Sequence, residues 1–88
     1  MKTGVELIAD ERRRQVEEEG WTAEHDDLHT KNQLIYAAVS YIMAGDGTLV
    51  QAYWPFARSW WKPEEDGVRN LVKAGALIAA EVDRLQRA

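Results

Sequence analysis

The chain contains no cysteine, and this absence excludes both a disulfide framework and a thiolate metal site. It also has no long hydrophobic run, since no stretch approaches the roughly 18 apolar residues that a membrane-spanning helix needs. The N-terminal segment lacks the apolar core of a signal peptide. We therefore expect residues 1–88 to form a single cytoplasmic domain that does not enter a membrane.

Other absences restrict the chemistry. There is no glycine-rich phosphate loop, and no serine stands in a nucleophile elbow, so covalent catalysis has no candidate residue. The net charge is −4, and the acidic residues concentrate in residues 1–29. This distribution argues against general duplex-DNA binding, which depends on neutralising phosphates with lysine and arginine. It is compatible with a bound divalent cation.

Three segments have the apolar spacing of amphipathic helices. The first is predicted over residues 4–19 and ends at the glycine that follows. The second begins at Thr30, which forms a capping-box pattern with Gln33, and stops at Gly45. The third begins at Pro63, where three acidic residues follow the proline, and runs to the C-terminus.

The segment between the second and third helices, residues 48–63, is rich in aromatic residues but has no clean period. We expect a short helical turn around residues 49–54, followed by an irregular strap. The rings in this segment either cover the bundle as core, or leave Trp60 and Trp61 exposed to stack a base or anchor a partner. The predicted fold is all-α, a three-helix bundle with an irregular tryptophan-rich strap between helices two and three.

Both histidines of the chain lie in one short connection, residues 19–29, together with several carboxylates. Imidazole and carboxylate are ligand types that suit Zn²⁺, Mn²⁺ or another divalent metal such as Mg²⁺. Adjacent side chains rarely converge on one point, so a metal site would also need a carboxylate from elsewhere in the chain. The predicted metal ligands are His25, Asp26, Asp27, His29, Glu19 and Glu81.

The same connection permits two further interpretations. In one, Asp26 or Asp27 caps the following helix and His25 is solvated. In the other, the cluster is a surface for a protein partner. A metal or phosphate-ligand site, a helix cap and a partner surface are all open from the sequence.

A small basic and aromatic patch lies in the strap, where Arg58 and Lys62 flank two tryptophans. Such a patch can hold a nucleotide phosphate while a ring stacks the base. Alternatively, the basic side chains simply lie with their stems along the rings. The predicted ligand-binding residues are Arg12, Trp21, Arg58, Trp60, Trp61 and Lys62.

The first helix has an unusual polar line. Arg12, Gln15 and Glu19 lie on or beside the side of the helix that faces the predicted core. If these groups are buried, each needs a partner, because an unpaired buried charge is very costly. The pattern predicts either a polar cleft between the first and third helices, or a helix end that meets water.

The chain resembles small proteins encoded by bacteriophages and prophages, through the segments ELIADERRRQVEEEGWTAEHDDLH, WPFARSWWKP and NLVKAGALIAAEVDRLQR. It is more distantly similar to MazG-like all-α nucleotide pyrophosphohydrolases, through Glu11, Arg12, Trp21, His25, Asn32, Leu34 and Ala37. That resemblance implies Mg²⁺ held by carboxylates and hydrolysis of nucleoside triphosphates. The family's acidic motifs are not present, because residues 34–44 contain no acid and Glu81 and Asp83 have the wrong spacing.

Two functions follow as expectations. In the first, a phage-type accessory protein binds a nucleotide, a divalent metal or both in a helical cleft, without efficient turnover; an active form would be a metal-dependent nucleotide pyrophosphohydrolase. In the second, it inhibits a host or defence protein, or sequesters a signalling nucleotide, in the cytoplasm of an infected or lysogenic bacterium. A homo-oligomer is expected in either case, because so short a chain gains stability from assembly.

Overall fold

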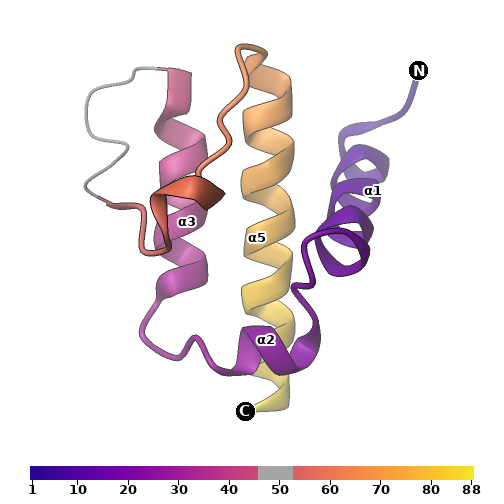
Figure 1. The fold of residues 1–88 in the computed structure, drawn as a ribbon. Coiled ribbons are helices and arrows are strands. Elements are labelled where there is room, and N and C mark those ends of the chain that lie inside the picture. Colours follow the sequence, from indigo (N-terminus) through magenta and orange to yellow (C-terminus); the bar gives the residue numbers. More distant parts are fainter. Residues whose placement is uncertain (46–52) are drawn as a thin grey trace.

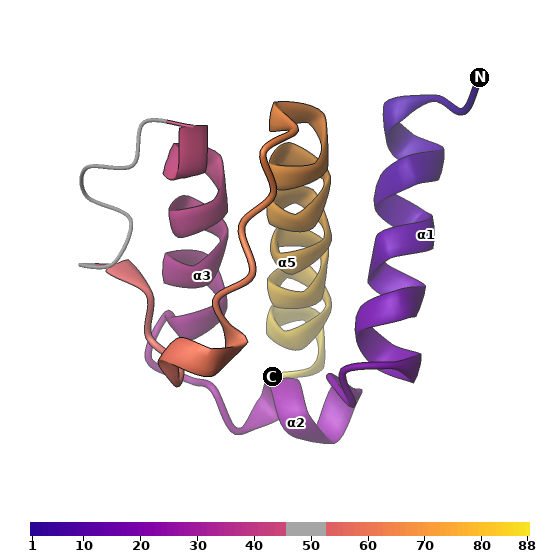
Figure 2. The ribbon, with the colours of Figure 1, turned by 45° about the horizontal axis from the view of Figure 1, so that its top comes forward.

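The computed structural model describes residues 1–45 and 53–88, and every regular element in these ranges is helical. Helices α1, α3 and α5 stand side by side, with the short α2 across one end (Figure 1). Helix α5 lies between the other two (Figure 2). The elements are α1 (Gly4–Glu17), α2 (Ala23–Asp27), α3 (Gln33–Ile42), η1 (Met43–Gly45), η2 (Arg58–Trp60) and α5 (Gly67–Arg87). The predicted all-α helical bundle is confirmed, and the turn predicted around residues 49–54 falls largely outside the described residues.

Helix α1 forms where the sequence predicts it. The Thr3 hydroxyl accepts a hydrogen bond from the Glu6 backbone N–H at 3.2 Å, and the Glu6 carboxylate accepts one from the Thr3 N–H at 2.8 Å. This capping box satisfies two N–H groups that the first turn leaves without helical partners. The helix ends at Glu17, and Gly20 reverses the chain with a φ of +74°, a conformation that favours glycine.

The connection between α1 and α3 is more ordered than predicted. Thr22 caps the short helix α2, which the sequence analysis did not predict, by accepting a hydrogen bond from the His25 N–H. The capping box predicted for Thr30 and Gln33 is wrong, because the Gln33 side chain accepts from the Lys31 N–H at 2.6 Å instead. Helix α3 begins after Asn32, whose left-handed backbone (φ 64°) suits asparagine.

Helix α5 begins four residues later than predicted. Asp66 caps it by accepting a hydrogen bond from the Val68 N–H at 2.9 Å. The side chain of Asn70 holds the preceding segment outside the helix, because it accepts from the Glu64 N–H and donates to the Glu64 carbonyl, both at 2.8 Å. Within the described ranges, no helix is long and apolar enough to cross a membrane.

The hydrophobic core lies between α3 and α5 and is closed by one tryptophan from the α1–α2 connection. Its buried members are Trp21, Leu34, Ala37, Ala38, Tyr41, Ala74, Leu77 and Ala80. The alanines allow the two helix backbones to approach closely, since packing distance depends on the side chains at the contact. Helix α1 contributes no residue to this cluster, and its buried residues are Glu11 and Gln15. The fully buried residues with which the first helix docks on α5 are therefore polar, and Ile8 adds an apolar contact with Gly75.

The tryptophan strap, residues 53–66, lies over α3 and then runs beside α5 (Figures 1 and 2). Trp54, Phe56 and Trp61 are partly buried against the core, and Trp61 lies 4.7 Å from the Tyr41 ring between centroids. Trp60 is 45% exposed. Each of the two alternatives predicted from the sequence therefore holds for one of the two adjacent tryptophans: Trp61 covers the bundle and Trp60 faces outward.

Leu77 tests this description of the core. It is fully buried between α3 and α5, so Leu77→Ala should lower the free energy of unfolding by about 2–5 kcal/mol through lost burial and the cavity left behind. Urea denaturation followed by tryptophan fluorescence measures the change. Leu28→Ala is the matched control, because Leu28 is exposed and its loss should change stability by less than about 0.5 kcal/mol. Equal effects of the two substitutions would contradict the assigned core.

Candidate functional site

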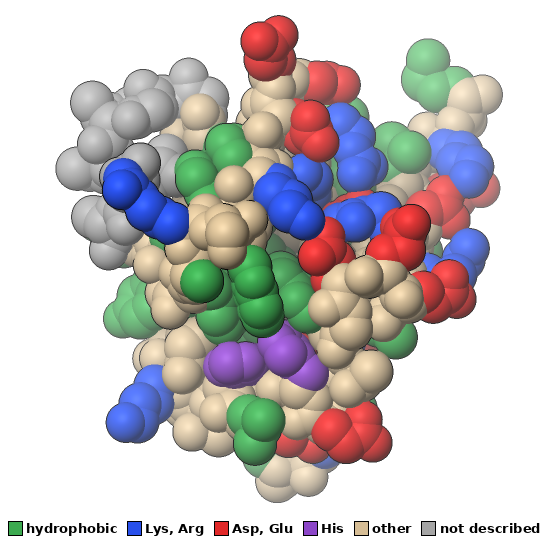
Figure 3. All heavy atoms as spheres, viewed as in Figure 1, with side chains coloured by type: hydrophobic (Ala, Val, Ile, Leu, Met, Phe, Trp, Pro, Cys, Tyr) green, Lys and Arg blue, Asp and Glu red, His purple; other side chains and the backbone are tan. Residues whose placement is uncertain are grey.

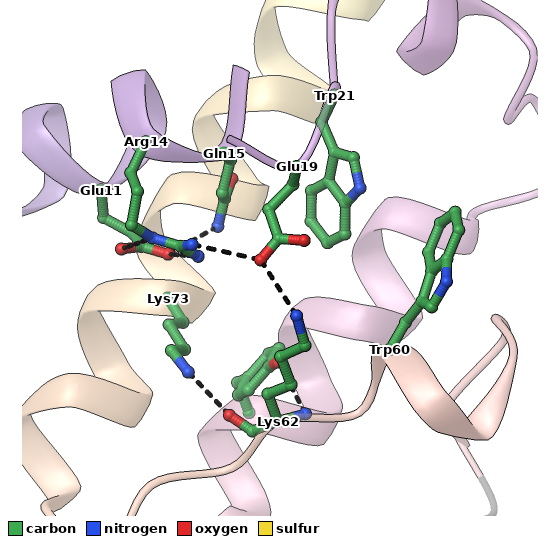
Figure 4. A pocket seen from close by; sticks show the side chains of 9 residues that line it. Glu11, Arg14, Gln15, Glu19, Trp21, Trp60, Lys62 and Lys73 are labelled. Carbon is green, nitrogen blue, oxygen red and sulfur yellow. Dashed lines mark hydrogen bonds and ion pairs between the residues drawn. The ribbon is translucent and has the colours of Figure 1, made fainter. Parts of the chain in front are cut away.

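A narrow polar pocket lies where α1, α5 and the tryptophan strap meet (Figure 4). Its volume is about 20 Å³, which has room for roughly one water-sized group. The polar face of α1 forms one wall, Lys73 comes from α5, and Trp60 and Lys62 come from the strap. The lining residues are Glu11, Arg14, Gln15, Glu19, Trp21, Tyr41, Trp60, Lys62 and Lys73.

Glu11 is the buried anion at the base of this wall. Its carboxylate accepts two hydrogen bonds from the Arg14 guanidinium, at 2.9 and 2.8 Å, and one from Arg69 of α5 at 2.8 Å. Burial alone raises the pKa of a carboxyl group, but these charged hydrogen bonds outweigh it and hold the pKa of Glu11 below its ordinary value of 4.5. Glu11 therefore stays ionised and ties α1 to α5.

Gln15 lies one helical turn after Glu11 and is also buried. Its Nε2 group donates to the Glu11 carboxylate at 3.4 Å, which directs the amide carbonyl away from that contact. The carbonyl oxygen Oε1 is buried and has no hydrogen-bond partner among residues 1–45 and 53–88. A buried acceptor without a donor costs roughly 1–3 kcal/mol, so a donor that reaches this oxygen would be stabilised.

The mouth of the pocket carries charges of both signs. The Glu19 carboxylate contacts the guanidinium of Arg14 at 3.1 Å and the ammonium of Lys62 at 3.5 Å. Lys73 is buried and donates to the Lys62 carbonyl at 2.6 Å and to the Glu64 carboxylate at 3.1 Å. These bonds fix the strap against α5 and place the Lys62 side chain at the rim (Figure 4).

Aromatic groups complete the pocket. The Trp21 and Trp60 ring centroids lie 6.4 Å apart, and Trp60 forms the exposed side of the pair. The Tyr41 hydroxyl accepts a hydrogen bond from the Lys62 N–H at 3.3 Å. Burial is the main reason that the pKa of Tyr41 lies above its ordinary value of 10.0, so the hydroxyl stays protonated at neutral pH.

The two histidines form a second, adjacent group on α2 and the residues after it. Figure 3 shows both of them at the surface, beside hydrophobic side chains. The His25 Nδ1 atom lies 2.9 Å from the buried carboxylate of Asp26. The same carboxylate accepts a hydrogen bond from the Arg12 guanidinium at 2.8 Å. The His25 and His29 Nε2 atoms lie 3.3 Å apart. Burial and the neighbouring His25 place the pKa of His29 below its ordinary value of 6.5, although Asp26 opposes this.

The six predicted metal ligands do not converge on one point. Each predicted carboxylate is paired with a different arginine: Asp26 with Arg12, Asp27 with Arg87, Glu19 with Arg14, and Glu81 with Arg84. In residues 1–45 and 53–88, no three acidic or histidine side chains lie close enough to share an ion. The carboxylate site for Mg²⁺ that the MazG-like resemblance implies does not fit this donor set, because guanidinium groups already neutralise the acids. Of the predicted ligands, only His25 and His29 present facing donor atoms.

The predicted ligand-binding residues fall into separate places. Trp21, Trp60 and Lys62 line the polar pocket. Arg12 instead donates hydrogen bonds to the Asp26 carboxylate and to the Trp21 carbonyl. Arg58 and Trp61 line a different, more apolar hollow with Trp54 and Phe56. Only three of the six therefore meet at one site.

Sequence reasoning missed several residues of the pocket, chiefly Glu11, Arg14, Tyr41 and Lys73. The spacing of Glu11 and Gln15, four residues apart, was the signal that could have found the polar face, since such residues share one side of a helix. Lys73 carried no local signal, because its partners lie in the strap.

Comparisons with protein-family models, with curated proteins and with solved structures found no match for this chain. The resemblance to phage proteins and to MazG-like enzymes therefore stays a prediction from the sequence segments that carry it. What the pocket binds has to follow from its own side chains.

Glu11 makes the stability of the protein depend on pH. Because its folded-state pKa lies below the unfolded value, its stabilising contribution is present above about pH 4.5 and is lost as the pH falls through the folded value. Glu11→Gln should cost about 1–3 kcal/mol of unfolding free energy at pH 7, less than a fully buried pair, because Arg14 and Arg69 are each about one-third exposed.

Urea denaturation between pH 3 and pH 7 measures this dependence, and the difference from the wild type should shrink at the acidic end. Glu17→Gln, at an exposed position of the same helix, is the control and should change stability by less than about 0.5 kcal/mol throughout. A Glu11→Gln deficit that is the same at pH 3 and pH 7 would contradict the ionised, buried carboxylate.

Proposed function

We propose that this protein binds a nucleotide at the mouth of the polar pocket and holds it without turning it over. The supporting observation is that the half-exposed Trp60 ring and the Lys62 ammonium line one pocket with Gln15, whose buried carbonyl has no donor in the part of the chain that the structure describes. A nucleotide offers a partner for each group: a planar base, a phosphate and, on most bases, an exocyclic amine.

The rim supports ring and phosphate binding. An exposed tryptophan supplies a stacking face that accepts any base and contributes roughly 1–3 kcal/mol per base. Lys62 extends 59% of its side-chain surface into solvent and is held only loosely by Glu19, at 3.5 Å. Three cations and two carboxylates line the pocket, and the Lys73 ammonium is already paired with the Glu64 carboxylate at 3.1 Å. Lys62 is therefore the lining cation that is most available to an anionic group such as a phosphate.

The narrow interior supports recognition of an amine. A volume of about 20 Å³ excludes a base ring but admits one water-sized group. The Gln15 Oε1 atom is an acceptor, so the group that enters should be a hydrogen-bond donor. The base thus lies on Trp60 with its amino group directed inward, and the phosphate lies toward Lys62.

Binding without turnover is favoured because the predicted carboxylates are paired with arginine side chains. Hydrolysis of the MazG-like kind relies on carboxylates that hold Mg²⁺, and the predicted carboxylates here are each paired with an arginine. A protein that binds a nucleotide and leaves it intact lowers its free concentration. Such binding would be sufficient for a phage-type accessory protein to sequester a signalling nucleotide in the cytoplasm of an infected bacterium.

Calorimetry and thermal melting with a panel of nucleotides test the proposal. A nucleotide present at 100 times its dissociation constant should stabilise the fold by about 2.7 kcal/mol and should be recovered unchanged afterwards. Trp60→Ala should abolish the shift, and Lys62→Ala should weaken phosphate-bearing ligands more than nucleosides. Adenosine monophosphate should bind about tenfold more tightly than inosine monophosphate, because inosine lacks the amine that Gln15 would accept.

Lys31→Ala is the control, because Lys31 is an exposed lysine that does not line the pocket. Its nucleotide affinity should equal that of the wild type. If no nucleotide shifts the melt, or if Trp60→Ala binds as well as the wild type, the proposed function is wrong. Capture of a host or defence protein would then favour the inhibitor alternative.

A second copy of the chain is the partner that we propose for the outer face of α5. Five large apolar side chains are exposed there, Val68, Leu71, Ile78, Val82 and Leu85, each between 43% and 57%. Their spacing of three and four residues follows the seam positions of a two-helix packing interface, interrupted at Gly75, which Ile8 of α1 contacts. Val5 of α1 is also exposed. A regular apolar seam suits another copy of the same helix, because a symmetric pair satisfies both seams at once.

Sedimentation equilibrium at micromolar concentration should therefore show a dimer. Leu71→Lys should shift it toward the monomer, because a charge in the seam would be desolvated on association. Leu28→Lys, at an exposed leucine outside the seam, should leave the assembly unchanged. A clean monomer at this concentration would rule the dimer out.

A further inference from the structure

We infer that His25 and His29 hold a divalent transition metal, Zn²⁺ being the best match, between their Nε2 atoms. The two imidazoles come from α2 and from the residue after its C-terminal cap, and they lie at the surface beside the aromatic residues of the core (Figure 3). This site is separate from the polar pocket, which neither histidine lines. The inference does not depend on nucleotide binding.

The distance between the facing nitrogens fits a metal. The Nε2 atoms of His25 and His29 lie 3.3 Å apart. Two imidazole nitrogens on a tetrahedral Zn²⁺, each about 2.0–2.1 Å from the ion, are about 3.3–3.4 Å from each other. The spacing therefore matches that of a ligand pair, and metal binding would replace the proton that one Nε2 shares with the other in this contact.

The buried partner of His25 prepares its free nitrogen for a metal. Asp26 is fully buried, and its carboxylate lies 2.9 Å from His25 Nδ1. The neutral tautomer that donates to this carboxylate carries its proton on Nδ1 and leaves the Nε2 lone pair free for a metal. Arg12 fixes the same carboxylate at 2.8 Å. This carboxylate–histidine arrangement is the one that orients imidazole ligands in many metal sites.

Neighbouring rings hold both imidazoles in position. His25 stacks parallel to Trp21, with 5.7 Å between centroids and an interplanar angle of 2°. His29 meets the edge of Phe56 at 5.0 Å and 78°. Ligands that are locked by packing lose little side-chain freedom when an ion binds, which favours affinity.

The donor set selects the metal class. Imidazole nitrogens suit Zn²⁺, Cu²⁺, Ni²⁺ and Co²⁺, whereas Mg²⁺ prefers oxygen ligands. In the described ranges no third acidic or histidine side chain joins this pair. The remaining positions therefore belong to water or to an added ligand, and an open coordination sphere of this kind can accept an anionic group.

Metal titration of the whole chain, purified without a polyhistidine tag, tests the site. Isothermal calorimetry with ZnCl₂ should show one saturable site per chain, and Co²⁺ should give a visible absorption band. MgCl₂ at the same concentration should give neither heat nor a change in the melt. His29→Gln removes one ligand and should weaken Zn²⁺ binding by more than about tenfold. Asp26→Asn should weaken it about 10–100-fold by misorienting His25.

Asp27→Asn is the matched control, because Asp27 lies in the same helix and is paired with Arg87 away from the two nitrogens. Its Zn²⁺ affinity should equal that of the wild type. If Asp26→Asn does not fold, His25→Gln replaces it with the same expectation as His29→Gln. The inference fails if the wild type shows no saturable Zn²⁺ binding, if His29→Gln binds as tightly, or if Asp27→Asn weakens binding as much as His29→Gln does. Each of these outcomes leaves the nucleotide proposal untouched.

Discussion

The buried carboxylate of Glu11 is the constraint on which the rest of the structure depends. Helix α1 brings no large apolar side chain into the core, so its position on α5 relies on the hydrogen bond that Glu11 accepts from Arg69 of α5, together with the contact of Ile8 with Gly75, while Arg14 of the same helix holds the Glu11 carboxylate in place. A buried charge is tolerated only when its partners are in place. The inward face of α1 is therefore polar, and the space beside it forms the pocket that Gln15 lines.

Arginine pairing shapes both candidate sites in the same way. In the polar pocket, Arg14 joins Glu11 to Glu19 and leaves Lys62 as the loosely held cation at the rim. Around the histidines, Arg12 holds Asp26, which in turn orients His25. In each place an acid serves as a structural anchor, so its neighbours, and not the acid itself, are available to a ligand. This is why a chain rich in acids presents an imidazole pair and a lysine at its sites.

Local sequence signals predicted most of the helices and few of the contacts. The apolar spacing of residues 4–19 and the long stripe to the C-terminus predicted α1 and α5 well, because these signals lie within one helix. The start of α5 was wrong because Asn70 holds the Glu64 backbone outside the helix, a contact between segments. A polar cleft was one of two alternatives predicted from Arg12, Gln15 and Glu19; Gln15 and Glu19 line the pocket, Arg12 does not, and Lys73 and Tyr41 reach it from distant elements. The histidine cluster could be predicted from the sequence. The short distance between its two Nε2 atoms could not, because it depends on helix α2, which was not predicted.

The most direct test of this account is a double-mutant cycle between Glu11 and Arg69, the ion pair that joins α1 to α5 at 2.8 Å. Unfolding free energies of the wild type, Glu11→Ala, Arg69→Ala and the double variant are measured by urea denaturation at pH 7 and one protein concentration. If polar contacts dock the first helix, the two substitutions couple by more than about 1 kcal/mol. Effects that add to within about 0.3–0.5 kcal/mol would show that α1 is held by something else, and the polar pocket would lose its structural basis.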